Sequence, residues 1–528
     1  MIISSRSFWV ALLIASNLAP GSVQAQTPRS GGILKFAVTA EPPNYDCHAQ
    51  ISFAFVHPVR PHYSSLLKFK SDAYPEIQGD VAESWQVSGD GLSYAFKLRK
   101  NVVFHDGSPM TSADIKATYE RIINPPQGVI SIRRAAYSDI KTIETPDPYT
   151  VVFKLGLPNA AMLSLFASPW DCIYSAAKLK MDPKWPEKNI LGTGPFKFVG
   201  HEAGSHWIGE RFKDYFVTGR PYLDGFRAFF IRNSAAWVNA IQAGEITTEF
   251  RSTTPAERNR LVEALGDKVQ VQESPWICSL VITMNTQKKP FDDARVRRAL
   301  SLGIDRWKGA EVLGKISLSR HVGGLLRPGY DLAANEQDLV RYPGFDKDFA
   351  KSQAEAKRLL KEAGVPNLKF KLTNRNVPQP YTSAGVFLID QWRQIGVTVE
   401  HEQLDTKLYF AALQGADFDA GIDPYCEFMD EPNLQLIKFI SADKSTINLS
   451  RYNDRQLDDL FERQSRTLDK GERYRIIREF EQRVLDQAYT IPVLWWHRIV
   501  VHWKQMHGWH MTPSTYLNQD LTDVWLDQ

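Results

Sequence analysis

The sequence predicts an α/β fold divided into several lobes. Helix and strand patterns alternate most clearly between residues 352 and 405, as they do in units whose helices cover a sheet of parallel strands. The 528 residues leave room for about two to four domains. No single long linker separates the blocks of pattern, so we expect the chain to cross between its lobes more than once.

The composition is that of a folded protein without a nucleic-acid-binding face. Hydrophobic residues make up 43% of the chain and charged residues 23%, which is normal for globular domains. Lys and Arg number 63 against 60 Asp and Glu, a net charge of +3. Proteins that bind the phosphate backbone carry a larger basic excess, so we expect no nucleic-acid partner.

The N-terminal residues predict export from the cytoplasm. Arg6 precedes an apolar run from Phe8 to Ser16, and Val23 and Ala25 are the small residues that signal peptidase requires. The run is too short for the roughly 20 residues of a membrane span. We therefore predict a signal peptide over residues 1–25, no lipid anchor, since no Cys follows the cleavage point, and a free periplasmic protein.

In the first half of the chain, short strands and one clear helix follow each other. Gly31 to Val38, Leu92 to Arg99 and Tyr149 to Leu155 have the alternating or apolar pattern of strands. Between the last two, Ser112 to Ile123 places Ile115, Tyr119 and Ile122 on one face, which predicts a helix with Ser112 as its cap.

A second block begins at the turn Gly192 to Pro195, which leads into a strand from Phe196. Ala235 to Ala243 predicts a helix ended by Gly244, and Ile277 to Asn285 a buried strand. Asp293 to Asp305 has apolar residues at helical spacing and predicts one helix.

The last third gives the clearest pattern. Helix, strand, helix and strand are predicted in turn, and two more helices and an aromatic strand follow. These segments are Ser352 to Gly364, Leu368 to Asn374, Gly385 to Gly396, Val397 to Leu404, Asp454 to Arg466, Glu472 to Gln487 and Tyr489 to Trp496.

Motifs of common enzymes and nucleotide-binding proteins are missing. No phosphate-binding loop, GxSxG elbow or HExxH helix occurs, and Ser175 to Lys178 matches SxxK without its companion motifs. His497 and His502 are five residues apart, which puts them on opposite faces of a strand and disfavours a shared metal ion. We expect no enzyme activity, no cofactor and no metal site.

Four cysteines remain for disulfides in an oxidising compartment. Cys47, Cys172, Cys278 and Cys426 are an even number and form no CxxC pair. From the residues alone, three pairings stay open.

Several segments together resemble one protein family. Gly79 to Ile122, the GTGPF sequence at Gly192, Asn285 to Arg306 and Tyr489 to Trp496 are similar, in the same order, to family 5 solute-binding proteins of peptide and nickel ABC transporters. The resemblance implies a monomeric two-lobed type II binding protein that closes like a flytrap and delivers its ligand to an inner-membrane permease. It also implies the division 26–57, 190–274 and 486–528 for lobe 1, 58–189 for a subdomain inserted in lobe 1, and 275–485 for lobe 2.

The same resemblance assigns the cysteines and raises a doubt about peptides. Cys278 and Cys426 match a bridged pair in the oligopeptide-binding members, which leaves Cys47 with Cys172. Peptide-binding members carry an Asp two residues after the second Cys, where it pairs with the peptide α-amino group. This chain has Phe428, and an unpaired buried ammonium is costly.

The candidate ligand-binding residues come from both predicted lobes. They are Tyr45, His48, Trp170, Arg375, Tyr425, Glu427, Phe428 and Asp430. The alternative role is loop packing for the three lobe 1 residues, a surface salt bridge for Arg375, and a cap of the next helix for the cluster Asp430 to Pro432. Three hypotheses follow. The first is a transport receptor for a small organic solute, peptide-like, amphipathic or carboxylated. The second is a receptor for a metal chelate or haem, and the third is a periplasmic hydrolase on the same scaffold.

Overall fold

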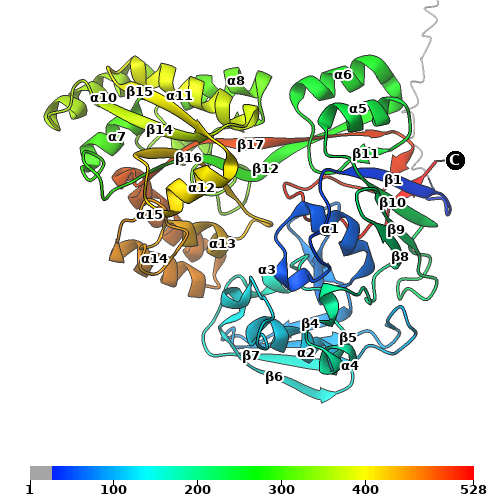
Figure 1. The fold of residues 1–528 in the computed structure, drawn as a ribbon. Helices are drawn as coiled ribbons and strands as arrows, with labels where there is room; N and C mark the ends of the chain where they lie inside the picture. The colour runs from blue at the N-terminus through cyan, green and yellow to red at the C-terminus, as the bar shows by residue number, and fades with distance from the viewer. Residues whose placement is uncertain (1–26, 528) are drawn as a thin grey trace, which may run out of the picture.

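The computed structural model describes residues 27–527. It contains two lobes that lie side by side, with a smaller sheet below one of them (Figure 1). We call the part with β1 and β8 to β11 lobe 1, and the part with β14 to β16 lobe 2. The predicted signal peptide, residues 1–25, lies outside the described residues. Within residues 27–527, no helix has the length and apolar character needed to cross a membrane.

One large sheet runs through both lobes. Its strand order is β15-β14-β16-β12-β17-β11-β1-β10-β9-β8, with β13 paired to β17. β14 pairs in parallel with β15 and β16, and β1 with β10 and β11, so the predicted α/β class is confirmed. The strands are β1 Ile33–Val38, β8 Phe196–Glu202, β9 His206–Arg211, β10 Gly225–Phe230, β11 Thr248–Glu249, β12 Val269–Met284, β13 Ser319–His321, β14 Lys369–Arg375, β15 Thr398–Leu404, β16 Ala420–Cys426 and β17 Thr490–Trp503.

Two long antiparallel strands, β12 and β17, connect the lobes (Figure 1). At one end Val269 pairs with Trp503 beside the lobe 1 strands, and at the other Thr283 pairs with Thr490 beside β16. Both strands are longer than the sequence predicts. The extra residues of β12, Gln270 to Ser274, are polar or half exposed, so they lack the continuous apolar run of its buried half. The extra residues of β17, His497 to Trp503, are mostly buried, with polar His and Arg side chains interrupting the apolar ones.

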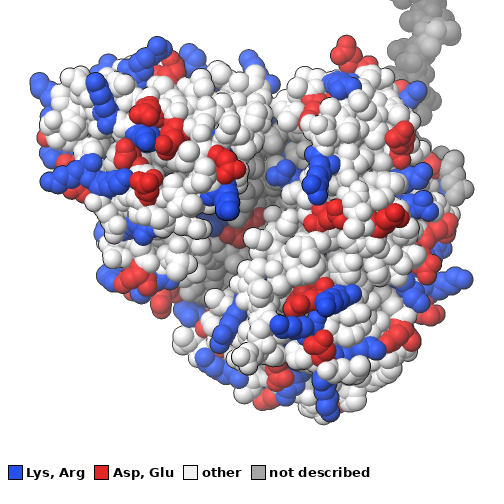
Figure 2. Space-filling view, viewed as in Figure 1, with Lys and Arg blue, Asp and Glu red and all other residues white. Residues whose placement is uncertain are grey.

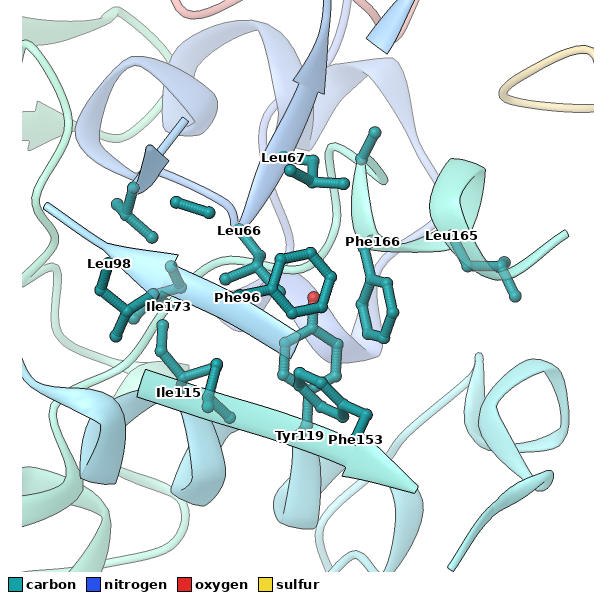
Figure 3. Packing of buried hydrophobic residues seen from close by; sticks show 14 of the residues in the cluster. Leu66, Leu67, Phe96, Leu98, Ile115, Tyr119, Phe153, Leu165, Phe166 and Ile173 are labelled. Atoms are coloured by element: carbon teal, nitrogen blue, oxygen red, sulfur yellow. The ribbon is translucent and has the colours of Figure 1, made fainter. Parts of the chain in front are cut away.

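The smaller sheet belongs to a compact subdomain of lobe 1. β4 Ala82–Val87, β5 Ser93–Leu98, β7 Thr150–Leu155 and β6 Ile140–Asp147 pair antiparallel in that order. Helix α2, Ser112–Ile123, covers one face of this sheet. Phe96, Phe153, Phe166 and Tyr119 stack edge to face in its core (Figure 3), which adds aromatic contact energy to the burial of apolar area.

Helices cover the large sheet in both lobes, and short strand pairs complete the fold. In lobe 1 these are α1 Phe53–Val59, α3 Met162–Phe166, α4 Ala176–Met181, α5 Ser234–Gln242, α6 Pro255–Leu265, β2 Leu67–Phe69, β3 Ile77–Gly79, β18 Met506–His507 and β19 Trp525–Leu526. In lobe 2 they are α7 Ala294–Leu302, α8 Arg306–Ile316, α9 Glu336–Leu339, α10 Phe349–Glu362, α11 Ser383–Arg393, α12 Thr406–Gln414, α13 Pro432–Leu436, α14 Arg455–Arg466 and α15 Lys470–Gln487.

Two predicted helix boundaries are wrong. Ser112 is the first residue of α2 rather than its cap, because Thr111 is the last extended residue and its N–H donates to the Asp114 carboxylate at 2.7 Å. The helix predicted over Asp293 to Asp305 ends at Leu302. Asp305 instead caps α8, where its side chain accepts a hydrogen bond from the Lys308 N–H at 3.0 Å.

Both predicted disulfides are present. Cys278 is bonded to Cys426 and Cys47 to Cys172. The first bridge links neighbouring strands, since Cys278 on β12 lies opposite Cys426 on β16.

Candidate functional site

The two lobes face each other across a hollow that lies beside the connecting strands. Figure 2 shows this hollow in the surface, with basic and acidic side chains on its walls. On the lobe 1 side α1 and α3 lie near it, and on the lobe 2 side α12, α13 and the loop after β16 (Figure 1). The chemistry of the site depends on which polar groups along these walls already have partners.

Beside the hollow, hydrogen bonds join lobe 2 directly to the subdomain of lobe 1. We call this group of contacts the clasp. In each of these hydrogen bonds the donor in one lobe has an acceptor in the other, at 2.7 to 3.3 Å. They join Asp430 N–H to Tyr74 OH at 2.7 Å, Ala160 N–H to Ser465 O at 2.9 Å, Asn433 Nδ2 to Asn159 Oδ1 at 3.3 Å, and Arg466 Nη1 to Asp139 Oδ2 at 2.7 Å and Pro158 O at 3.1 Å.

Asp430, a predicted ligand-binding residue, is fully engaged inside lobe 2. Its carboxylate accepts three hydrogen bonds from Arg327, at 2.8 and 3.0 Å. Burial raises the pKa of Asp430, and the Arg327 charge acts against that shift. Both side chains are buried, so this ion pair anchors the loop after β16.

Glu427 and Tyr425 are also held by lobe 2. Glu427 Oε1 lies 2.6 Å from Lys438 Nζ, and Lys438 donates as well to the carbonyl of Cys426 at 3.2 Å. Tyr425 is 4% exposed and packs edge to face on Phe439. Tyr425 is therefore a core residue of lobe 2, whereas Glu427 stays at the wall with its charge balanced.

Phe428 reaches across to lobe 1. Its carbonyl accepts a hydrogen bond from Ser514 Oγ at 2.7 Å, and its ring centre lies 5.4 Å from the guanidinium carbon of Arg133. Trp170 lies closer to the same guanidinium carbon, at 4.4 Å. Two of the predicted residues thus form an aromatic wall around Arg133, a cation that the sequence analysis did not select.

Arg133 has few acceptors for its charge. Its Nη2 donates to the carbonyl of Gln50 at 2.8 Å, but Nε and Nη1 are buried without a hydrogen-bond partner in the described residues. The acid behind it is Asp171, whose carboxylate accepts a hydrogen bond from Tyr137 OH. Burial raises the pKa of Asp171 to about 7, against the effect of the Tyr137 hydrogen bond and the Arg133 charge.

Arg251 stands at the lobe 1 end of the connecting strands. The Glu249 carboxylate accepts hydrogen bonds from the backbone N–H groups of Arg251 and Ser252 at 2.9 and 3.0 Å, which fixes this turn. The Arg251 guanidinium carbon lies 4.7 Å from the ring centre of Phe53 and 5.6 Å from that of Trp276. Within residues 27–527 this guanidinium group makes no hydrogen bond or ion pair.

Arg375 is the last residue of β14 in lobe 2. Ligand sites of α/β sheets lie at such strand ends. Its guanidinium carbon is 4.4 Å from the ring centre of Phe410 and 4.6 Å from that of Tyr381. Nη1 donates to Tyr381 OH at 3.2 Å, and Nη2 is 3.8 Å from Asp423 Oδ1. Burial raises the pKa of Asp423 to about 6, and Arg375 acts against that shift.

Aromatic rings connect these arginines across the two lobes. Trp276, under Arg251, packs on Trp496 with ring centres 5.5 Å apart, and Trp496 packs on Tyr381, under Arg375, at 6.2 Å. Trp170, under Arg133, packs on Tyr516 at 5.6 Å. The charges of Arg251 and Arg133 both act against the burial that raises the pKa of Tyr516. We call Arg133, Arg251 and Arg375 the arginine cluster.

Tyr45 and His48 do not join this cluster. Tyr45 packs on Phe198 and Trp207 of the outer strands β8 and β9, and its hydroxyl bonds to His201 Nδ1 at 2.9 Å. His48 is buried beside Arg121, 2.9 Å from its Nη1, and burial lowers the pKa of His48 to about 3. Tyr45 is hydrogen-bonded within lobe 1, and His48 is buried there beside Arg121 with its Nε2 unpaired among the described residues, so we leave both out of the proposed site.

Comparisons with known proteins give a consistent picture. Residues 76–446 match the family model described as bacterial extracellular solute-binding proteins, family 5 Middle. The glutathione-binding protein GsiB of Pectobacterium atrosepticum is 28% identical over 473 residues, which is 88% of each chain. Two solved structures are similar along almost their whole length. The first is DppA of Helicobacter pylori in complex with the peptide STSA, with a TM-score of 0.77, 24% identity and coverage of 95% of this chain and 99% of that one. The second is AgaA of A. tumefaciens R10 in complex with agropinic acid, with a TM-score of 0.76, 25% identity and coverage of 94% of this chain and 99% of that one.

Proposed function

This chain belongs to the family 5 bacterial extracellular solute-binding proteins and is the substrate-binding component of an ABC importer, and on that premise we propose how it works. It captures one small organic solute in the hollow between its lobes, in the periplasm, and delivers it to an inner-membrane permease. The family resemblance predicted from the sequence is confirmed, and so is the two-lobed fold.

The observation that carries this proposal is the arginine cluster. Arg133 and Arg251 on lobe 1 and Arg375 on lobe 2 are connected by aromatic rings and, within residues 27–527, keep N–H donors without an acceptor. A solute that contacts both walls gains its full set of contacts only when the lobes are closed. Ligand binding therefore shifts the population towards closure, with β12 and β17 as the hinge.

We propose the same division of the chain as the sequence predicts: 26–57, 190–274 and 486–528 for lobe 1, 58–189 for the subdomain, and 275–485 for lobe 2. Separate groups of core residues support it. One group consists mainly of subdomain residues from Leu66 to Ile173, and another of residues from Trp276 to Trp496 in lobe 2 and its hinge strands. The first group also contains residues from other parts of the chain: Leu191, Phe212, Tyr215, Phe216, Met429 and Leu517. Separate cores allow each part to move as a rigid body.

Export fits the same proposal. The predicted cleavable signal peptide sends the chain to a compartment where disulfides persist, and all four cysteines are bridged. Neither alternative hypothesis gains an observation of its own. Within residues 27–527 no group of three His, Cys, Asp or Glu side chains is placed to hold a metal ion, and the relatives named above are binding proteins rather than hydrolases.

The test is native mass spectrometry of the protein exported to a periplasm. We expect a complex with one small solute that is lost on denaturation, and small-angle scattering that shows a more open molecule after the solute is removed. An unaltered scattering curve with and without solute would contradict closure. Turnover of the solute by purified protein would favour the hydrolase hypothesis.

A further inference from the structure

We propose that the solute is an organic anion with at least two acid groups, held by the arginine cluster, and that it carries no free amine at the Phe428 end. This inference deepens the proposed function, on which it rests. It assigns one acid group to lobe 1, at Arg133 and Arg251, and another to Arg375 on lobe 2.

Three arginines that are buried elsewhere in the protein have acceptors for their N–H groups. Arg327 gives three hydrogen bonds to Asp430. Arg121 gives two to Asp46, at 3.1 and 2.6 Å. Arg498 donates to four backbone carbonyls, those of Arg251, Thr512, Ser514 and Phe250. These arginines follow the rule that buried charges are paired or fully hydrogen-bonded.

The members of the cluster are half-buried, and they leave more of their donors unused. A guanidinium group has five N–H donors. Arg133 uses one on Gln50, Arg375 uses one on Tyr381, and Arg251 uses none within residues 27–527. Each group lies over aromatic rings, which hold it by cation–π attraction and accept no strong hydrogen bond. The unused donors therefore point to acceptors supplied by a ligand.

The acids near the cluster do not supply those acceptors. Glu427 is 2.6 Å from Lys438, and Glu249 is occupied by two backbone N–H groups. Asp171 is bound by Tyr137, and Asp423 is 3.8 Å from Arg375. Burial raises the pKa of Asp171 and Glu249 to about 7 and that of Asp423 to about 6. At pH 7 carboxyls with these pKa values carry between about half and about nine-tenths of a negative charge each, so they offset part of the charge of the three arginines and leave the cluster with a smaller net positive charge.

The geometry of guanidinium groups selects carboxylate or a similar acid. The planar fork of Arg fits both oxygens of a carboxylate, and a charge-assisted bidentate pair is among the strongest hydrogen-bonded contacts. An aromatic ring beneath the guanidinium plane leaves its edge, where the N–H donors are, open to a ligand. The rings also suit an apolar or flat body between the acid groups.

An ammonium group is disfavoured at the Phe428 end. The nearest charged group to the Phe428 ring on the lobe 1 side is the Arg133 guanidinium, 5.4 Å away, so a ligand amine there meets a like charge. Asp430 and Glu427 on the same loop are already paired with Arg327 and Lys438. A carboxylate introduced at position 428 would first pair with Arg133 rather than with a ligand amine.

The test uses a matched series of probes: linear α,ω-dicarboxylates of increasing length, their monoamides, and the ω-amino acids of the same length. Titration calorimetry and thermal shift are run on the full chain after denaturation and refolding to remove retained solute. We expect at least one diacid to bind at least tenfold more tightly than its monoamide, and the ω-amino acid to bind most weakly. The solute found by native mass spectrometry should contain two acid groups and no primary amine.

Variants test the assignment of each end. Arg251→Gln and Arg375→Gln should each weaken diacid binding by tenfold or more, and Arg375→Gln should remove the preference for diacid over monoamide. Arg232→Gln is the matched control, because the Arg232 side chain is 81% exposed and only reaches Glu41 at 4.0 Å. Circular dichroism and the Arg375→Lys variant, which keeps the charge, separate loss of the contact from loss of the fold.

The outcomes distinguish failure of the anion inference from failure of the proposed solute-binding function. An amine-bearing peptide or ω-amino acid that binds as tightly as the best diacid, or a retained solute with a primary amine, overturns the anion inference and leaves the binding function intact. A protein that retains no solute and binds none of the probes overturns both. Equal losses for diacid and monoamide in Arg375→Gln would assign Arg375 a structural role instead.

Discussion

The clasp and the arginine cluster both lie where the two lobes meet, but they use their polar groups in opposite ways. In the clasp each donor has an acceptor in the protein, as in the 2.7 Å bond from Arg466 to Asp139, and the loop that carries Asp430 is anchored by Arg327. In the cluster the guanidinium groups rest on aromatic rings with donors left over. The difference teaches that satisfied polar groups join lobes, whereas unsatisfied ones indicate where a ligand belongs.

The largest expected effect is on the free energy of unfolding, at the ion pair between Arg327 and Asp430. Arg327→Ala leaves the buried Asp430 carboxylate without its partner, which should lower the free energy of unfolding by about 3–5 kcal/mol. Urea denaturation of the variant and of the exposed control Arg232→Ala measures it. A loss below about 1 kcal/mol would mean that the loop after β16 relaxes and that the clasp is less rigid than its contacts suggest.

The next effect concerns the acid behind Arg133. Because the pKa of Asp171 is raised to about 7 in the folded protein, its contribution to stability is fully present below pH 3.8 and is lost as the pH rises through 7. Asp171→Asn stays neutral, so its stability relative to the native chain should rise between pH 4 and 7 and level off above 8. The slope is at most about 1.4 kcal/mol per pH unit. Urea denaturation of both proteins over a pH series measures this. If the two plots of unfolding free energy against pH run parallel, Asp171 is instead ionised throughout as a partner of Arg133.

A smaller effect on the free energy of unfolding is expected at Arg133, whose charge has no ion-pair partner in the described residues. Arg133→Met removes a buried cation that has one hydrogen bond and no ion pair in the described residues. The free energy of unfolding should stay within about 1 kcal/mol of the native value or rise, since an uncompensated charge is lost and apolar packing is kept. The same substitution should weaken solute binding. Destabilisation as large as that of Arg327→Ala would erase the distinction between the two regions.

The smallest effect is expected at the exposed edge of the clasp. Arg466→Gln weakens a partly exposed ion pair between the lobes, and such pairs contribute up to about 1 kcal/mol. Because this contact joins the lobes, its loss should lower solute affinity by about two- to fivefold in calorimetry. Arg463→Gln on the same helix is the control, since its carboxylate contacts are at 3.7 and 4.0 Å and it makes no contact with lobe 1. If Arg466→Gln and Arg463→Gln bind the solute with equal affinity, the clasp does not contribute to closure of the lobes.

Much of the fold could be predicted from the sequence because its determinants are local. The alternation between Ser352 and Leu404 corresponds to α10, β14, α11 and β15, which differ from the predicted bounds by a few residues. The strand ends of β12 and β17 were missed where polar residues pair across the hinge. Their pattern of burial depends on the partner strand rather than on neighbours in the chain.

The candidate residues came partly from the family resemblance and partly from the position of Arg375 at a strand end. Trp170, Phe428 and Arg375 take part in the cation–π contacts of the proposed site, while Asp430 and Tyr425 pack within lobe 2 and His48 within lobe 1. Arg133 and Arg251 were not selected, because nothing in their local sequence distinguishes them from other arginines. In the structure both lie over aromatic rings with N–H donors that no group of residues 27–527 accepts, and that depends on which distant side chains pack around them.

The sequence by itself determined the α/β class, the family and, through that family, the cysteine pairs, and it predicts an export signal. These rest on periodicity, composition and motifs, which are properties of neighbouring residues. Only the tertiary structure decided which charges are neutralised. Arg327 and Asp430 are 103 residues apart, and Arg133 and Phe428 come from different lobes. Whether a buried arginine is a structural group or a ligand-binding one is set by such contacts, because electrostatic and hydrogen-bond energies depend on distance in space and on burial.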